Sequence, residues 1–219
     1  MIRGAIFDLD GTLLDSMPVW DTLASDYLRS LGTSPKPGLD EAVSRMSVEQ
    51  AAEYIRGEYG LAETPEEIVR GVNGMLGDFY RQTAPLKPGV PGFLERLREG
   101  GVKMCVATAT DRSLVEAALL RTGVREYFSE IFTCAGVGHG KDEPDIFRAA
   151  LAHLGTPKSA TVVFEDALHA VATAKRDGFV VAAVYDSHEP RCGEAAVLAD
   201  VRICDFADAA GFWSFASGV

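Results

Sequence analysis

The stretch Ile2-Arg3-Gly4-Ala5-Ile6-Phe7-Asp8-Leu9-Asp10-Gly11-Thr12-Leu13-Leu14-Asp15 decides the interpretation of the whole chain. It begins as an apolar run, which is typical of a strand buried in a parallel sheet. Asp8 and Asp10 then follow at spacing i, i+2, directly before a Gly-Thr turn. Carboxylates that converge on one small volume repel each other, so one is protonated or a cation lies between them. A pair that offers only oxygen ligands favours a hard cation, and Mg²⁺ is the natural candidate.

The composition is that of a globular protein with an acidic surface. The 219 residues are 47% hydrophobic and 24% charged, with a net charge of −11. Such a charge repels nucleic acids and anionic membranes, so we expect neither as a partner. No apolar run approaches the ~20 residues of a membrane span, and no targeting segment is recognisable. We therefore expect a cytoplasmic protein, with a monomer as the default state.

The four cysteines do not form a metal or disulfide pattern. Cys105, Cys134, Cys192 and Cys204 include no Cys-x-x-Cys pair and no accompanying histidine cluster. Zinc ligation and a disulfide framework are therefore not expected. Cys105 lies within an apolar run and is predicted to belong to the core.

Residues 16–84 show helical patterns only and predict an inserted, all-helical domain. Ser16 is predicted to cap the first helix, with Pro18 in its first turn. Thr64 and Glu67 fit a capping box that opens a helix from 65 to about 82. Further helices are predicted over 39–45 and 47–58. The chain should cross between the domains near Asp15 and near Ala84-Pro85, which we predict to be hinges.

In residues 1–15 and 85–219 predicted strands alternate with predicted helices, so these two segments are expected to form one further domain. The expected strands after the first are 102–108, 131–134, 161–164, 180–184 and 201–204, and the expected helices are 91–99, 112–122, 143–154 and 167–176, with a loop over 136–140. This alternation favours an α/β fold, a Rossmann-like parallel sheet covered on both faces. Ligands of such sheets bind beyond the carboxyl ends of the strands. Asp8, Asp10, Thr108, Glu165 and Asp166 all fall at predicted strand ends.

Three further segments complete a pattern with the N-terminal one. Thr108 ends an apolar strand, Lys141 lies in Gly140-Lys141-Asp142-Glu143-Pro144-Asp145-Ile146-Phe147, and Glu165-Asp166 follow Val162-Val163-Phe164. Together with Asp8-Leu9-Asp10-Gly11-Thr12-Leu13, these segments resemble the four motifs of the haloacid-dehalogenase-like superfamily of phosphotransferases, in the expected order. The helical insertion after the first motif is similar to the branch whose cap lies between motifs one and two.

The sequence departs from the family pattern at a few positions. Asp142 stands where relatives more often have proline. Ala167 and His169 replace a common serine and glycine after the acidic pair. We assign His169 no catalytic role, because a surface or core histidine is the simpler interpretation.

The resemblance implies a role for each site residue. Asp8 would be the nucleophile that forms an aspartyl-phosphate, and Asp10 the general acid and then the base for water. Thr108 and Lys141 would hold the phosphoryl oxygens, with Lys141 neutralising charge during transfer. Mg²⁺ would be held by Asp8, the Asp10 carbonyl, Asp166 and Glu165, the last directly or through water.

Several functions within the family stay open. A dehalogenase is disfavoured, because those relatives lack the second aspartate and Asp10 is present here. A mutase similar to β-phosphoglucomutase has a cap histidine where Trp20 stands and a Gly-hydrophobic-Ser-Arg string whose counterpart, Arg45-Met46-Ser47-Val48, lacks the glycine and arginine. We therefore prefer a phosphatase that acts on a small phosphorylated metabolite, of the sugar or polyol phosphate class. A catalytically silent binding protein is the third alternative, but both Asp8 and Lys141 are retained.

Candidate substrate contacts come from the cap and from the residue after Thr108. These candidates are Met17, Trp20, Arg45, Met46 and Ala109. For Met17, Trp20 and Met46, packing within the cap is an equally good interpretation, because apolar residues at helical spacing are usually core.

Overall fold

The computed structural model describes residues 2–43, 46 and 48–218. The chain forms two compact units, one of Met1–Ser16 and Ala84–Val219 and the other of Met17–Thr83. We call them the sheet unit and the helical unit, and describe each by itself.

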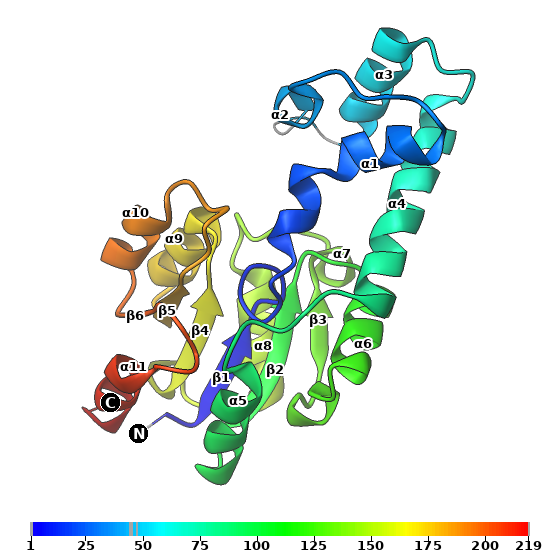
Figure 1. Ribbon diagram of the computed structural model, residues 1–219. Helices are drawn as coiled ribbons and strands as arrows, with labels where there is room; N and C mark the ends of the chain where they lie inside the picture. Colours follow the sequence, from blue (N-terminus) through cyan, green and yellow to red (C-terminus); the bar gives the residue numbers. More distant parts are fainter. Residues whose placement is uncertain (1, 44–45, 47, 219) are drawn as a thin grey trace. The chain divides into compact units, whose positions relative to one another are not determined.

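The sheet unit contains one six-stranded parallel sheet. Its strands are β1 (Gly4–Phe7), β2 (Lys103–Thr108), β3 (Ile131–Thr133), β4 (Thr161–Glu165), β5 (Val180–Val184) and β6 (Val201–Ile203), in the order β3-β2-β1-β4-β5-β6 (Figure 1). The predicted α/β fold with a parallel sheet is thereby confirmed. In the register, Phe7 pairs with Phe164. The residues that follow, Asp8 and Glu165, therefore leave neighbouring strands at the same level.

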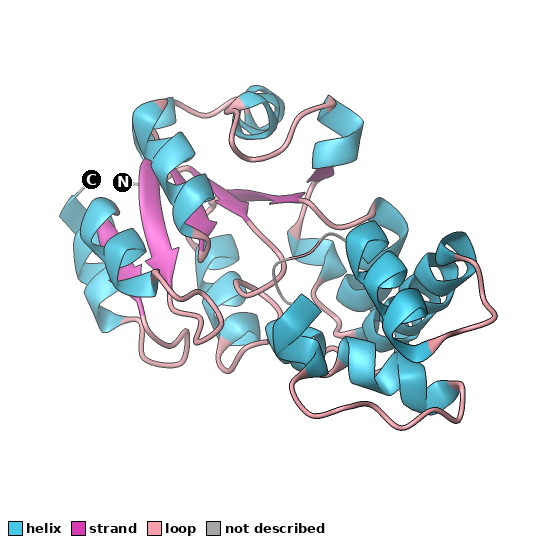
Figure 2. Cartoon of the chain, turned by 90° about the horizontal axis from the view of Figure 1, so that it is seen from above, coloured by secondary structure: helices cyan, strands magenta, loops and turns pink. Residues whose placement is uncertain are grey.

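Both faces of the sheet are covered by helices, as Figure 2 shows, and the strands read as continuous apolar runs for that reason. On one face Ile6, Cys105 and Val163 pack with apolar residues of α8 (Asp145–Leu154) and α9 (Leu168–Arg176). On the other face Phe7 stacks on Phe164, with ring centroids 4.2 Å apart. Aromatic rings of α5 (Val90–Glu99) and α11 (Ala210–Gly218) complete this second layer.

The remaining helices of the sheet unit connect the strands. They are α6 (Arg112–Arg121), α7 (Cys134–Val137) and α10 (Cys192–Leu198), with short 3₁₀ turns at Arg125–Tyr127 and Lys158–Ala160. The loop predicted over 136–140 is wrong at its start, where α7 forms. The Thr133 hydroxyl caps this helix by accepting a hydrogen bond from the Gly136 N–H (3.1 Å).

The helical unit contains a 3₁₀ helix, Met17–Asp21, and four α-helices, and no strand among its described residues. The α-helices are α1 (Leu23–Ser30), α2 (Leu39–Val43), α3 (Val48–Tyr59) and α4 (Pro65–Gln82). Apolar residues of α1, α3 and α4 form its core, with Leu28 and Ile68 fully buried. The predicted capping box at Thr64 and Glu67 is confirmed. No described helix is long and apolar enough to cross a membrane.

The helix that follows Ser16 differs from the α-helix predicted there. A 3₁₀ helix, rather than an α-helix, follows this residue. The Ser16 hydroxyl instead donates a hydrogen bond to the Asp10 carboxylate at 2.6 Å. A side chain predicted to stabilise a helix end thus contacts a candidate catalytic residue.

Candidate active site

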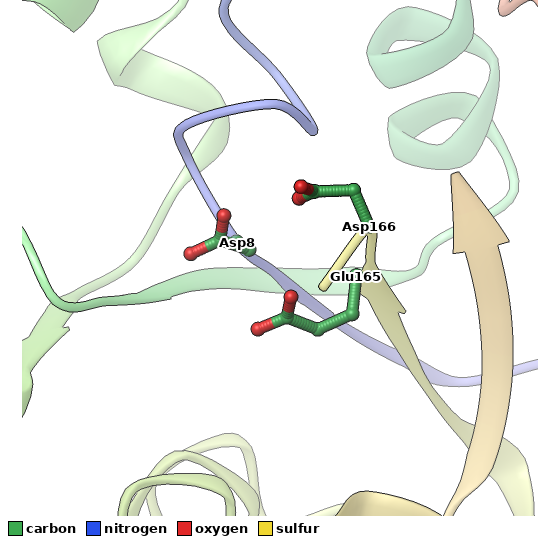
Figure 3. Close-up of side chains that lie close together, drawn as sticks. All are labelled: Asp8, Glu165 and Asp166. Carbon is green, nitrogen blue, oxygen red and sulfur yellow. The ribbon is translucent and has the colours of Figure 1, made fainter. Parts of the chain in front are cut away.

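Three carboxylates meet at the carboxyl end of the sheet. Asp8 follows β1, Glu165 ends β4 and Asp166 comes directly after it (Figure 3). Their oxygen ligand atoms all lie within 4.8 Å of one another. All three residues are buried, Glu165 with only 1% of its surface exposed. We call these residues the carboxylate cluster. Sequence reasoning placed each of them at a strand end, and the parallel register brings them together.

Lys141 supplies the positive charge inside the cluster. Its ammonium group donates to Asp8 Oδ1 and to Glu165 Oε1. The residue lies shortly before α8, which packs against β1 and β2, and only 7% of its surface is exposed. A buried lysine with two carboxylate partners is far from the ordinary solvated lysine. Its position fits a group that compensates negative charge beside Asp8.

The cluster has more negative groups than one lysine can compensate. The pKa values of its carboxylates and of the lysine are shifted as a result. Burial raises the pKa of Asp166 to about 7, and the negative charge of Asp8 adds to the effect. Burial likewise raises the pKa of Glu165 well above its usual range, although the charge of Lys141 opposes it. Burial acts to lower the pKa of Lys141, but the charges of Asp8 and Glu165 outweigh it and the pKa is raised. The lysine therefore stays charged, while the carboxylates favour protonation or a cation.

The N-terminal turn holds Asp166 in place. The buried Thr12 hydroxyl donates to Asp166 Oδ1 at 2.8 Å. Gly11 adopts φ +77°, and a Cβ added there would lie 2.5 Å from Asp166 Oδ2. Only glycine therefore allows the turn to approach the carboxylate this closely.

Asp10 lies outside the carboxylate cluster, with its side chain held by two hydroxyl groups. Ser16 Oγ donates to Asp10 Oδ1 and Thr110 Oγ1 donates to Oδ2, both at 2.6 Å. The side chain is half-buried. The ligand role expected of Asp10 concerns its main-chain carbonyl, and its carboxylate is held by hydroxyl groups.

Thr108 ends β2 at the same edge of the sheet and is 1% exposed. Its Oγ1 accepts a hydrogen bond from the Thr110 N–H at 3.1 Å. The neighbouring Ala109 is exposed. The structure therefore places Thr108 at the end of β2 and Ala109 in the loop that follows.

The cap candidates belong to the helical unit and are not part of the carboxylate cluster. Trp20 and Met46 are exposed, at 44% and 37%, and Met17 is half-buried. For Trp20 and Met46, the alternative of core packing within the cap is not favoured by this exposure. Arg45 lies outside the described residues.

The donor chemistry of the cluster fits a hard divalent cation. Asp8, Glu165 and Asp166 offer oxygen ligands only, as Mg²⁺ prefers. Their burial and raised pKa values are those of carboxylates whose charges are not fully compensated by protein groups. The residues present therefore fit Mg²⁺.

Comparison with known proteins gives the family. The family model of haloacid dehalogenase-like hydrolases matches residues 2–178. The chain belongs to this family. The family match confirms the resemblance inferred from the four motifs, and the chain is a hydrolase of this family.

Individual relatives match over most of the chain. Hexitol phosphatase B of Escherichia coli (strain K12) is 28% identical over 208 residues, which cover 92% of this chain and 91% of the relative. A probable pseudouridine-5'-phosphatase of Drosophila melanogaster is 29% identical over 194 residues, covering 84% and 82%. A crystal structure from Thermotoga maritima, provisionally assigned as a β-phosphoglucomutase, superposes with a TM-score of 0.86 at 22% identity and covers 98% and 99% of the two chains. At that identity the structural likeness concerns the fold alone.

Sequence reasoning missed three hydroxyl groups of this haloacid dehalogenase-like site. Thr12 contacts Asp166, while Ser16 and Thr110 contact Asp10. Thr12 and Thr110 lie within or beside the motifs, so proximity to a motif was an available signal. The partners were not available, because Thr12 and Asp166 are 154 residues apart in the chain.

Proposed function

We propose that this hydrolase is a Mg²⁺-dependent phosphatase that hydrolyses a phosphate monoester of a small metabolite through an aspartyl-phosphate on Asp8. The observation that carries the proposal is the carboxylate cluster with Lys141 donating to Asp8 and Glu165. A nucleophilic carboxylate beside a buried cation is what transfer of an anionic phosphoryl group requires, because the two reactants otherwise repel each other.

In the first step an oxygen of Asp8 attacks phosphorus and the bond from phosphorus to the ester oxygen breaks. Asp10 gives its proton to the leaving oxygen, which departs as an alcohol. Lys141, through its contact with Asp8, compensates the charge that shifts between nucleophile and phosphoryl group. The Thr108 hydroxyl accepts from the Thr110 N–H and keeps its own proton to donate to a phosphoryl oxygen.

In the second step Asp10 accepts a proton from water, and the resulting hydroxide attacks phosphorus of the aspartyl-phosphate. The acyl phosphate bond breaks, inorganic phosphate leaves and the Asp8 carboxylate is restored. Acid–base assistance of this kind contributes about 10²–10⁴-fold to the rate.

Mg²⁺ would be held by Asp8, Asp166 and the Asp10 carbonyl, with Glu165 as a ligand or through water. When bound, the ion supplies positive charge that polarises the phosphoryl group and reduces repulsion between it and the carboxylates. Thr12 orients Asp166 for this role.

The substrate class is proposed from the relatives. The names of relatives include a hexitol phosphatase and a fructose-1-phosphate phosphatase, both of which act on phosphorylated polyols or sugars. We propose the same class for this chain, a protein of the cytoplasm that acts as a monomer. Residues 16–84 would serve as its cap domain, with Trp20, Arg45, Met46 and Ala109 as substrate contacts.

The test is Mg²⁺-dependent phosphate release from p-nitrophenyl phosphate and from a panel of sugar and polyol phosphates. We expect turnover with Mg²⁺, none in excess EDTA, and none in Asp8→Asn. Turnover retained in Asp8→Asn would remove the nucleophile assignment, and an inactive wild-type protein would favour a binding function. An isomerised sugar phosphate in place of inorganic phosphate would identify a mutase.

A further inference from the structure

Asp10 is held from two sides, by hydroxyl groups from two different parts of the sheet unit. Ser16 comes from the segment that follows β1, and Thr110 from the loop that follows β2. The two residues donate to different oxygens of the carboxylate, each at 2.6 Å. Two short bonds on opposite oxygens fix both the position of the carboxylate and its rotation.

Thr110 connects Asp10 to Thr108 as well. Its main-chain N–H donates to Thr108 Oγ1 at 3.1 Å, while its side chain donates to Asp10. One residue therefore sets the distance between the hydroxyl assigned to the phosphoryl group and the carboxylate assigned to the leaving oxygen. No family motif of the sequence analysis includes the Thr110 side chain.

We propose that Thr110 is a positioning residue for proton transfer, which orients the Asp10 carboxylate toward the leaving-group oxygen. The inference rests on the proposed function, because it assumes that Asp10 is the general acid. Thr110 itself exchanges no proton with the substrate. Its hydroxyl keeps the carboxylate at the distance from the phosphoryl site that proton transfer requires.

If Thr110 positions the general acid, the effect of removing its hydroxyl should depend on the leaving group, which a purely structural role would not predict. A poorly placed acid matters most when the leaving group needs its proton, and little when the leaving group is stable as an anion. The loss in kcat/KM on removing the hydroxyl should therefore grow from p-nitrophenyl phosphate through phenyl phosphate to an alkyl phosphate. A general distortion of the site would lower kcat/KM equally for all three.

The variants are Thr110→Val, which removes the hydroxyl at constant shape, and Thr110→Ser, which restores it. A matched control is Thr122→Val, since Thr122 is also half-buried and its hydroxyl donates to the Ala118 carbonyl of α6. We expect Thr110→Val to lower kcat/KM for the alkyl phosphate about 10–100-fold, the worth of one hydrogen bond to a charged group. For p-nitrophenyl phosphate we expect a loss under about 3-fold, with Thr110→Ser and the control close to wild type.

A double-mutant cycle completes the test. In an Asp10→Asn background, Thr110→Val should add no loss that depends on the leaving group. Equal losses for all three substrates, or a dependence that persists in Asp10→Asn, would overturn the inference while leaving an active, Asp8-dependent phosphatase intact. A loss confined to KM for one substrate would show that Thr110 binds that substrate instead. A wild-type protein without turnover would remove the proposed function and this inference with it.

Discussion

Replacing Asp166 with asparagine should stabilise the metal-free protein, although it removes a proposed metal ligand. The Asp166 carboxylate is buried close to Asp8 and Glu165, and its neutral hydrogen-bond partner is Thr12. Asparagine has nearly the same shape and can still accept a hydrogen bond from Thr12, but it carries no charge. The variant therefore removes electrostatic repulsion while it keeps the packing.

The magnitude follows from the pKa of Asp166, which is raised from 3.8 to about 7. Because the folded state holds this proton more tightly than the unfolded state, stability falls as pH rises from about 4 and levels off above about 7. Integrated over that range, the ionised Asp166 costs about 4 kcal/mol at pH 8 and about 2 kcal/mol at pH 5. In EDTA, Asp166→Asn should therefore raise the free energy of unfolding by at most about 4 kcal/mol at pH 8 and at most about 2 kcal/mol at pH 5.

The measurement is urea denaturation in EDTA at pH 5 and pH 8, with Asp186→Asn as the control. Asp186 is also buried, but Lys87 donates to it at 2.8 Å. Burial acts to raise its pKa, yet Lys87 and the His188 N–H outweigh burial and the pKa is lowered. We expect the control to lose about 1–3 kcal/mol, since it leaves the half-buried Lys87 without its ionic partner. An Asp166→Asn variant less stable than wild type at pH 8, or equally stabilised at both pH values, would refute this reasoning.

Three further results are expected. Lys141→Met should abolish measurable turnover and lower metal-free stability by about 3–5 kcal/mol, because it leaves buried carboxylates without their cation; near-wild-type kinetics would contradict this. Gly11→Ala should lose about 1–3 kcal/mol in thermal or urea unfolding, since its Cβ would meet the Asp166 carboxylate at a positive φ, and unchanged stability would show that the turn can adapt. Burial raises the pKa of Cys105 to about 12, so iodoacetamide at pH 8 should label exposed Cys204 and leave Cys105 unmodified until the protein is unfolded, as mass spectrometry can determine.

The sheet could be predicted from the sequence because strands buried on both faces are continuous apolar runs. Gly4–Phe7 and Thr161–Glu165 are such runs, and each is followed at once by acids. Since parallel strands end at one edge, the strand pattern places Asp8, Glu165 and Asp166 at the same edge of the sheet, and the pairing of β1 with β4 brings them together. The order β3-β2-β1-β4-β5-β6 did not follow from it, because pairing between strands far apart in the chain leaves no local signal.

The hydroxyl contacts could not be predicted for a different reason. Ser16 before Pro18 is a good local pattern for an N-cap. Such a pattern describes only contacts between a side chain and the neighbouring backbone. In the folded chain the Ser16 hydroxyl donates its proton to the Asp10 carboxylate at 2.6 Å, a contact that a helix-cap pattern does not describe. Similarly, a Cβ at Gly11 is excluded by Asp166, which lies far along the sequence.

The imbalance of charge in the carboxylate cluster links stability to function. Lys141 is the one cation that the described structure places in contact with Asp8 and Glu165, and it leaves Asp166 to a neutral hydroxyl. If a second lysine compensated Asp166, the metal-free protein would gain stability, but the site would lose its affinity for a divalent cation. A cation bound at 100 times its dissociation constant stabilises the folded state by about 2.7 kcal/mol, which is comparable to the cost of the ionised Asp166. Asp166 therefore lowers the stability of the metal-free protein and is also a residue on which metal binding should depend.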